Sequence, residues 1–418
     1  MQVKTLLNFV EKHKGFVYDS IKLSTYEGGP CIEVVVRPRQ GSKGVCSGCG
    51  KPRSGYDSLS PSRRFSFVPL WGIAVYFLYA MRRVDCPDCG VVVEHIPWGC
   101  GKRRLTNSYA WFLARWAKRL SWKETAVCFK TSWYVVFSSV EMAVNWGRER
   151  IDLSNVISIG IDEIQWQCGH KYLTLVYQID SGSRRLLWVG ESRKAKTLLR
   201  FFRWLGKEQT RKLQFISSDL WKPYLKVINK KAAQATHVLD RFHLVQRINK
   251  AIDKVRAAEA KKLKAENYEP VLKGARWCLL KREENLTPKQ ETKLAELLGY
   301  NLKSVRAYLL REQLDQLWNY VSPAWAGKFL DQWCTMVMRS KIEPMKDIAR
   351  SVRKHRELIL NWFRAKGEIS NGIVEGFNNK AKLTTRKAYG FRSFRGVEVA
   401  LLHTLGNLPE PELTHRFL

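Results

Sequence analysis

Hydrophobic and polar positions change their spacing along the chain, and each change predicts a different kind of structure. Between 105 and 150, apolar residues recur at helical spacing. The run VISIGIDEI (156–164) is rich in β-branched residues and is typical of a buried strand. The stretch 244–365 shows no strand alternation and contains several amphipathic segments. The pattern therefore predicts helices, then a sheet, then a second helical region.

The sheet region predicts strands and helices in a definite order. Strand-like runs cover 156–164, 171–180, 184–192, 213–221 and 235–243, and amphipathic helices cover 194–208 and 222–232. The order β-β-β-α-β-α-β is that of the ribonuclease-H-like fold. In that fold the first strand is central and the fourth lies beside it.

Two carboxylates fall on these neighbouring strands. Asp162 ends the first strand and Asp219 lies on the fourth. Close carboxylates repel, and a divalent cation such as Mg²⁺, which prefers oxygen ligands, reverses that cost. Strand alternation points Glu163 to the opposite face, so Asp162 is the predicted ligand and Glu163 is not. Strand-end acids that merely meet solvent are the alternative.

A helix predicted from about 370 carries a third acid. Glu375 lies in its first turn, and Asn379, Lys382 and Arg386 follow on the same face. A carboxylate, an amide and two cations in one stripe suit a metal-bound phosphodiester, with the last three side chains contacting DNA. A solvated helix face is the alternative.

Four cysteines form two C-x-x-C pairs, each followed by a glycine. Four thiolates can hold a tetrahedral zinc and close its coordination sphere, so we expect one structural Zn²⁺ rather than a catalytic one. A redox pair would need only one such motif. The predicted ligands are Cys46, Cys49, Cys86 and Cys89. The other six cysteines are expected to be small buried residues.

A helix-turn-helix is predicted after the cysteines. Ser121 and Glu124 have the spacing of a capping box, a short helix covers 122–129, and a longer helix starts at about Trp133 after the turn at 130–132. An ordinary helical hairpin has the same pattern, but the basic charge favours DNA binding.

The charge of the chain points to a polyanionic partner. The 418 residues include 72 basic and 38 acidic ones, which gives a net charge of +34. Nucleic acid is favoured over a membrane, because the longest apolar run, GIAVYFLYAM (72–81), is about half the length of a bilayer span. No signal peptide is evident, so we expect a cytoplasmic protein.

Four motifs together closely resemble bacterial insertion-sequence transposases of the ISL-three family. They are GIDE (160–163), SSDLW (217–221), VLDRFHL (238–244) and GIVEGFNNKAKLTTRKAYGF (372–391). The resemblance implies a DDE triad of Asp162, Asp219 and Glu375 with two Mg²⁺ (or Mn²⁺) ions. It also implies that Asp240 and His243 lie near the site and that 244–365 is a helical insertion.

The resemblance implies a DNA transposase that binds the terminal inverted repeats of an insertion sequence, cleaves double-stranded DNA and joins it to a target. Two ends must be cut and joined, so we expect a homodimer on paired ends. A catalytically silent regulator derived from a transposase is one alternative. A structure-selective nuclease of the same fold is another.

The expected fold class is multidomain α+β, in five segments. They are an N-terminal β-rich zinc-ribbon domain (1–100), a helix-turn-helix (101–150), the first part of a ribonuclease-H-like α/β core (151–243), an all-helical insertion (244–365), and the final core helix with the tail (366–418).

Overall fold

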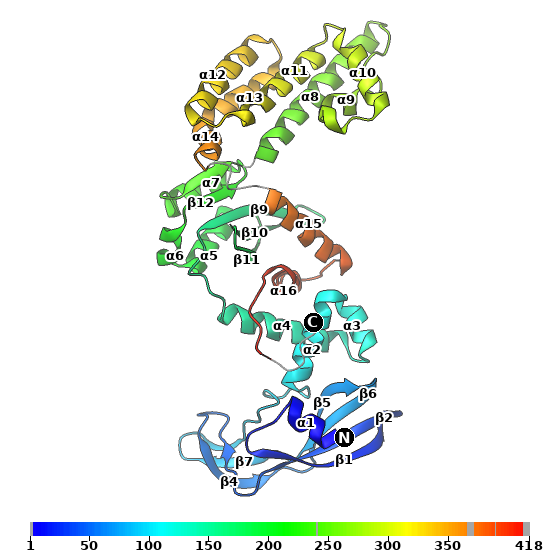
Figure 1. The fold of residues 1–418 in the computed structure, drawn as a ribbon, viewed down its shortest axis with the longest axis vertical. Coiled ribbons are helices and arrows are strands. Elements are labelled where there is room, and N and C mark those ends of the chain that lie inside the picture. The colour runs from blue at the N-terminus through cyan, green and yellow to red at the C-terminus, as the bar shows by residue number, and fades with distance from the viewer. Residues whose placement is uncertain (1–2, 240, 366–371, 389, 413–418) are drawn as a thin grey trace. The chain divides into compact units, whose positions relative to one another are not determined.

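The computed structural model describes residues 3–239, 241–365, 372–388 and 390–412. The chain divides into two compact units, and Figure 1 shows the elements of each. The first unit combines Met1–Ile151 with Thr384–Leu418, and the second is Asp152–Leu383. The second unit is therefore inserted, in sequence, between the two segments that form the first unit.

Two four-stranded sheets form the N-terminal part of the first unit, with the orders β1-β2-β6-β5 and β3-β4-β7-β8. Alternate side chains of β6, such as Val75, Phe77 and Tyr79, are buried, as period-two patterning requires. The strands are β1 Phe16–Tyr26, β2 Gly29–Pro38, β3 Gly44–Val45, β4 Pro52–Ser58, β5 Arg63–Leu70, β6 Ile73–Tyr79, β7 Arg82–Cys86 and β8 Gly90–Val93.

The helices of the first unit come from both of its chain segments. The capping box predicted at Ser121 and Glu124 is present, and it starts α3. α4 packs against α2 and α16, and Gly147 of α4 lies so close to Leu408 that a Cβ there would be 2.7 Å from the leucine side chain. The helices are α1 Val3–Val10, α2 Asn107–Arg119, α3 Trp122–Cys128, α4 Trp133–Glu149 and α16 Phe394–Leu405.

A five-stranded sheet in the order β11-β10-β9-β12-β13 organises the second unit. The central strand β9 is antiparallel to β10 and parallel to β12. The strands are β9 Ser158–Gln167, β10 Lys171–Asp180, β11 Ser183–Glu191, β12 Phe215–Ser218 and β13 Thr236–Leu239. The five predicted strands are present, although the last two are shorter than expected.

Helices cover both faces of this sheet. On one face, Val374 of α15 (Gly372–Lys387) lies directly against Gly160 of β9. On the other, Thr174 of β10 hydrogen-bonds the hydroxyl of Tyr224 in α7 (Lys222–Lys231). The helix predicted at 194–208 is two helices, α5 (Ala195–Leu205) and α6 (Lys207–Lys212), because Gly206 between them has a φ of +84°.

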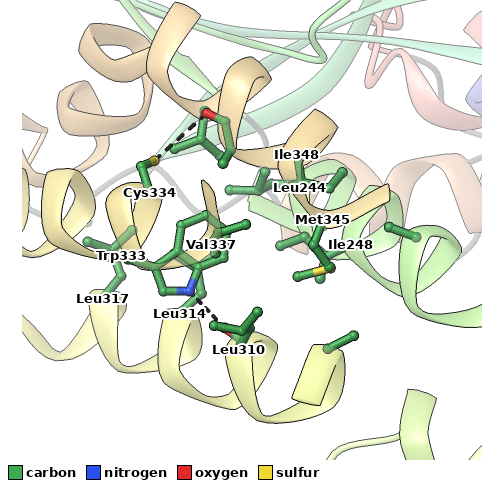
Figure 2. Packing of buried hydrophobic residues seen from close by; sticks show 14 of the residues in the cluster. Leu244, Ile248, Leu310, Leu314, Leu317, Trp333, Cys334, Val337, Met345 and Ile348 are labelled. Atoms are coloured by element: carbon green, nitrogen blue, oxygen red, sulfur yellow. Dashed lines mark hydrogen bonds between the residues drawn. The ribbon is translucent and has the colours of Figure 1, made fainter. Parts of the chain in front are cut away.

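The predicted helical region after β13 packs around its own apolar core. Figure 2 shows Trp333 near its centre, where the indole N–H donates to the Leu310 carbonyl at 2.8 Å. The elements are α8 Arg241–Ala265, α9 Arg276–Leu280, the 3₁₀ helix η1 Glu283–Asn285, α10 Pro288–Leu298, α11 Lys303–Asp315, η2 Gln316–Asn319, α12 Pro323–Arg339, α13 Glu343–Lys354 and α14 Arg356–Arg364.

The six cysteines outside the two pairs differ in their burial. The expectation that the six cysteines outside the pairs are buried is wrong for half of them: Cys31, Cys278 and Cys334 are buried, whereas Cys100, Cys128 and Cys168 are exposed. None of the helices in the described ranges has the length and apolar content needed to cross a membrane.

Candidate active site and cysteine cluster

Asp162 lies near the middle of β9 and not at the end of the strand as expected, because β9 continues to Gln167. It is half-buried, with polar groups from three directions. Its own neighbour Glu163 donates a backbone N–H to Oδ1 at 2.7 Å. The side-chain amide of Asn378 in α15 donates to Oδ2 at 2.5 Å. The Nε2 atom of His243 in α8 lies 3.8 Å from Oδ1. The carboxylate is therefore oriented by its own strand and by two separate helices.

Asp219 follows β12 directly and lies beside the same strand. Ser217 pairs in parallel with Gly160, and each of these residues is two positions before an acid, Asp219 and Asp162 respectively. Burial raises the pKa of the Asp219 carboxyl, the backbone N–H of Trp221 opposes that rise, and the charge of Asp162 adds to it. Two neighbouring carboxylates in a partly buried place are an environment that a divalent cation stabilises.

Asn378 joins the helix α15 to the sheet. It is buried, and its side-chain oxygen accepts a hydrogen bond from the Tyr177 hydroxyl at 2.8 Å while its nitrogen donates to Asp162. The ring of Phe377 stacks on that of Tyr177. The helical spacing predicted a role for its neighbour Asn379 and gave no sign of Asn378.

The remaining predicted residues of α15 lie on its exposed side. Glu375 is three residues before Asn378, in the turn whose Val374 touches Gly160. Glu375, Asn379, Lys382 and Arg386 are all exposed. The structure thus brings the helix that carries Glu375 against β9. Asp162, Asp219 and Glu375 do not all lie within 4.8 Å of one another.

Of the D-x-x-H motif, His243 lies in the first turn of α8. His243 approaches Asp162, as described above, whereas Asp240 lies outside the described residues. When protonated, His243 lowers the pKa of Asp219, so this histidine is close enough to act on both carboxylates.

Glu163 points to the sheet face covered by α5 and α7, as strand alternation predicts. Burial raises its pKa to about 7, and the charge of Asp219 adds to the rise, while Arg193, whose Nη1 atom lies 3.9 Å away, opposes it. Its Oε1 atom is buried without a hydrogen-bond partner among the described residues. The sequence offered only one sign of this environment, the pair of adjacent acids.

The four paired cysteines converge at one end of the sheet β3-β4-β7-β8. Their sulfur atoms all lie within 4.8 Å of one another, and the Cys49 and Cys86 sulfurs are 3.6 Å apart. Tetrahedral zinc with Zn–S bonds of about 2.3 Å needs sulfurs roughly 3.8 Å apart. The backbone N–H of Lys51 contributes most to a low Cys49 pKa, about 6, which favours the thiolate. The cluster is compatible with zinc.

Three further features complete this cluster. Gly50 and Gly90 have φ angles of +70° and +72°, as expected for the turn after each pair. A Cβ on Gly48 would be 2.7 Å from the Cys89 sulfur, so only glycine leaves room there. Arg53 bridges the two pairs, with its guanidinium 2.6 Å from Asp88 and 3.9 Å from the Cys49 sulfur.

Comparison with known proteins matches most of the chain. Residues 159–400 match the model of a family described as transposase, the ISL3 type of the DDE transposases. The chain belongs to the ISL3 transposase family. The match includes β9, β12 and α15, and so contains Asp162, Asp219 and Glu375.

Relatives named as transposases extend the similarity beyond these residues. The transposase for insertion sequence element IS1557 of Mycobacterium tuberculosis is 30% identical over 425 residues, covering 95% of this chain and 94% of the relative. The transposase for insertion sequence element IS1001 of Bordetella parapertussis is 28% identical, covering 83% of this chain and 85% of the relative. The similarity to transposases of insertion sequence elements thus spans nearly the whole length.

Proposed function

We propose that this chain is a DNA transposase that binds the ends of an insertion sequence and cleaves and joins DNA through Asp162, Asp219 and Glu375. One observation carries the proposal: Asn378 ties α15 to the Asp162 carboxylate. The same contact fixes the helix that bears Glu375 against the strand that bears Asp162. The parallel pairing of β9 with β12 supplies Asp219 from the other side.

The strand order supports a ribonuclease-H-like core. In such a core the central first strand runs antiparallel to the second and parallel to the fourth. β9 has this relation to β10 and β12. The helical region 244–365 then enters between the fifth strand and the helix that carries Glu375.

The carboxylates would hold Mg²⁺ or Mn²⁺, two ions in each site, because oxygen ligands suit hard divalent cations. The bound ions would activate a water or a 3′-hydroxyl and stabilise the leaving oxygen. Asp162 and Asp219 would hold the ions from the sheet, and Glu375 would complete the set of ligands from α15. Asn379, Lys382 and Arg386 extend along α15 from Glu375 and contact the phosphate backbone.

His243 serves this site as a positioning residue. It lies beside Asp162 and electrostatically affects Asp219. Asp240, three residues earlier in the chain, belongs to the same region by its sequence position.

The first unit would recognise the ends of the element. Cys46, Cys49, Cys86 and Cys89 would hold a structural Zn²⁺, since four thiolates leave no open coordination position. The helices α3 and α4 would form a helix-turn-helix that reads base edges in the major groove. Trp133 and Tyr134 at the start of α4 are exposed and available for such contacts.

The assembly would be a homodimer on paired ends, acting in the cytoplasm on double-stranded DNA. One chain carries one set of acids, and two ends must be processed together. A silent DNA-binding regulator and a nuclease that does not join strands are the rival functions.

Cleavage and joining of an end-containing duplex test the proposal. The wild type should nick the DNA with Mg²⁺ and produce strand-transfer products. Asp162→Asn and Asp219→Asn should bind the duplex normally and leave it intact. A wild type that binds but never nicks would indicate a regulator, and nicking without strand transfer would indicate a nuclease. Substantial cleavage by either asparagine variant would contradict the assignment of the acids.

A further inference from the structure

A basic groove lies between α5, α6 and α7, on the sheet face opposite α15. The three helices are labelled in Figure 1. Its volume is about 990 Å³. Arg203, Lys207 and Arg211 line one side at intervals of four residues, and Lys222, Lys226 and Lys230 line the other with the same spacing. No acidic residue lines the groove. The two rows therefore present a surface of one charge sign.

These six cations are exposed. None of them forms a salt bridge with a carboxylate in the part of the chain that the structure describes. The neighbouring Lys212, by contrast, pairs with Glu208. A row of unpaired cations is costly to hold together through mutual repulsion, and an external polyanion relieves that repulsion.

The apolar residues of the groove help to decide whether its partner is an acidic protein helix or a nucleic-acid backbone. Its apolar residues include Phe202 and Val227, which are buried, and Leu199, which is half-buried. An amphipathic acidic helix of another protein would need fully exposed apolar side chains as anchors, and every apolar side chain that lines the groove is buried or half-buried. Phosphates need only the exposed cations. The groove thus fits a sugar-phosphate backbone better than a protein helix.

The dimensions agree with a DNA backbone. Cations four residues apart on a helix are about 6 Å apart along its axis, so the α7 row extends for about 12 Å. A DNA strand rises about 3.4 Å per phosphate, so a row of this length spans three or four phosphates.

We propose that this groove binds the phosphate backbone of duplex DNA without reading its sequence, at a surface separate from the acids. The proposal rests on the proposed action on DNA and adds a second contact surface to it. Because the contacts would be to phosphate, they position the duplex and add affinity but no base preference. They also make binding strongly dependent on salt.

The test uses the full-length chain and a random-sequence duplex in EDTA, so that no cleavage is required. The triple variant Arg203→Ala/Lys226→Ala/Lys230→Ala should bind at least about tenfold more weakly near 0.1 M salt. The slope of log K against log salt should become shallower by about 2 to 3 units, since each phosphate contact contributes about 0.9. Circular dichroism would verify that the variant is folded.

A matched control removes the same charge elsewhere. Lys254, Lys261 and Lys264 are exposed on α8, and their triple alanine variant should keep the wild-type slope. The charge-preserving variant Arg203→Lys/Lys226→Arg/Lys230→Arg should keep most of the affinity. Equal slopes for the groove and control variants would overturn the proposal. Loss of binding to a poly-glutamate probe with unchanged DNA binding would also overturn it and indicate an acidic protein partner.

The outcome is separable from the test of the active site. The groove variants report on binding in EDTA, and the asparagine variants of Asp162 and Asp219 report on cleavage with Mg²⁺. A shallower salt slope in the groove variant together with an active Asp162→Asn protein would support DNA binding in the groove and contradict the catalytic assignment of Asp162.

Discussion

The side-chain amide of Asn378 donates a hydrogen bond to the Asp162 carboxylate, 216 positions away in the sequence. The orientation of that amide is set by Tyr177, whose hydroxyl donates to the Asn378 oxygen. With its oxygen occupied in this way, the amide presents its nitrogen to Asp162. A buried relay of this kind fixes the Asp162 carboxylate in one orientation and keeps α15 in place.

Replacement of Asn378 should therefore impair cleavage more than binding. Asn378→Ala removes the donor to Asp162, and loss of such a supporting contact typically costs 10- to 100-fold in metal affinity or activity. We expect cleavage to fall by roughly that factor, with a higher Mg²⁺ concentration at half-maximal rate. Leu383→Ala, which changes an exposed residue of the same helix, is the control for this effect. An unchanged cleavage rate and Mg²⁺ dependence in Asn378→Ala would show that its hydrogen bond to Asp162 does not contribute to cleavage.

Gly160 should tolerate no side chain while Val374 is present. A Cβ at position 160 would be 2.5 Å from the Val374 side chain, so Gly160→Ala must displace α15. Overpacking of this kind costs about 1–3 kcal/mol of unfolding free energy. Val374→Ala should restore stability and cleavage in the double variant, which urea unfolding and a nicking assay would measure. A double variant no better than Gly160→Ala alone would count against direct packing as the cause.

Glu163 should make stability depend on pH in the absence of divalent metal. The pKa is raised from 4.5 to about 7 in the folded chain, so the neutral form is favoured on folding. Below pH 4.5 the wild type and Glu163→Gln should be similarly stable. As the pH rises through 7, the wild type should lose up to about 3 kcal/mol relative to the variant.

Urea unfolding of both proteins in EDTA across this pH range would measure that difference. Control measurements on Glu208→Gln, which alters an exposed carboxylate of α6, should show no such trend. A constant difference between wild type and Glu163→Gln at all pH values would show that Glu163 is not buried as described.

Substitutions of Glu375 and Lys382 should impair different steps, cleavage in the first case and DNA binding in the second. Glu375→Gln keeps the size of the side chain but loses the charge, so it should bind DNA normally and not cleave it. Lys382→Ala should keep its Mg²⁺ dependence and bind DNA more weakly, with a salt slope shallower by about 0.9. Lys254→Ala on α8 is the matched control. Mg²⁺-dependent cleavage by Glu375→Gln would move the third ligand elsewhere, with Glu163 and Asp240 the next to test.

Removal of the cysteine ligands should remove one zinc. Metal analysis should find about one zinc per wild-type chain, and the double variant Cys46→Ser/Cys86→Ser should contain none. The variant Cys128→Ser/Cys168→Ser, which changes two exposed cysteines of the same chain, should retain the metal. Unchanged zinc content in Cys46→Ser/Cys86→Ser would place the metal at another site.

The elements that the sequence predicts well are those set by local patterns. β9 and β10 follow from runs of β-branched and aromatic residues, and the start of α3 follows from its capping box. The paired cysteines predict their own cluster, because their spacing and the glycines after them are local features.

The features that it missed depend on packing between distant segments. Asn378 and Asn379 are adjacent in the sequence, and only the contact of Val374 with Gly160 decides which of them faces Asp162. One step along a helix turns a side chain by about 100°, so a small error in the expected face selects the wrong residue. The closeness of Gly48 to Cys89 likewise appears only once both cysteine pairs have met.

The first unit can be completed only late in synthesis, because α4 packs against residues that follow it far along the chain. Gly147 of α4 packs against Leu408, and Arg148 pairs with Glu398 of α16 at 3.1 Å. A ribosome adds roughly 5–20 residues per second, so these partners emerge on the order of ten seconds or more after α4. During that interval the face of α4 that receives α16 stays uncovered. A chain released before α16 therefore contains every residue of 1–151 and still lacks a finished first unit.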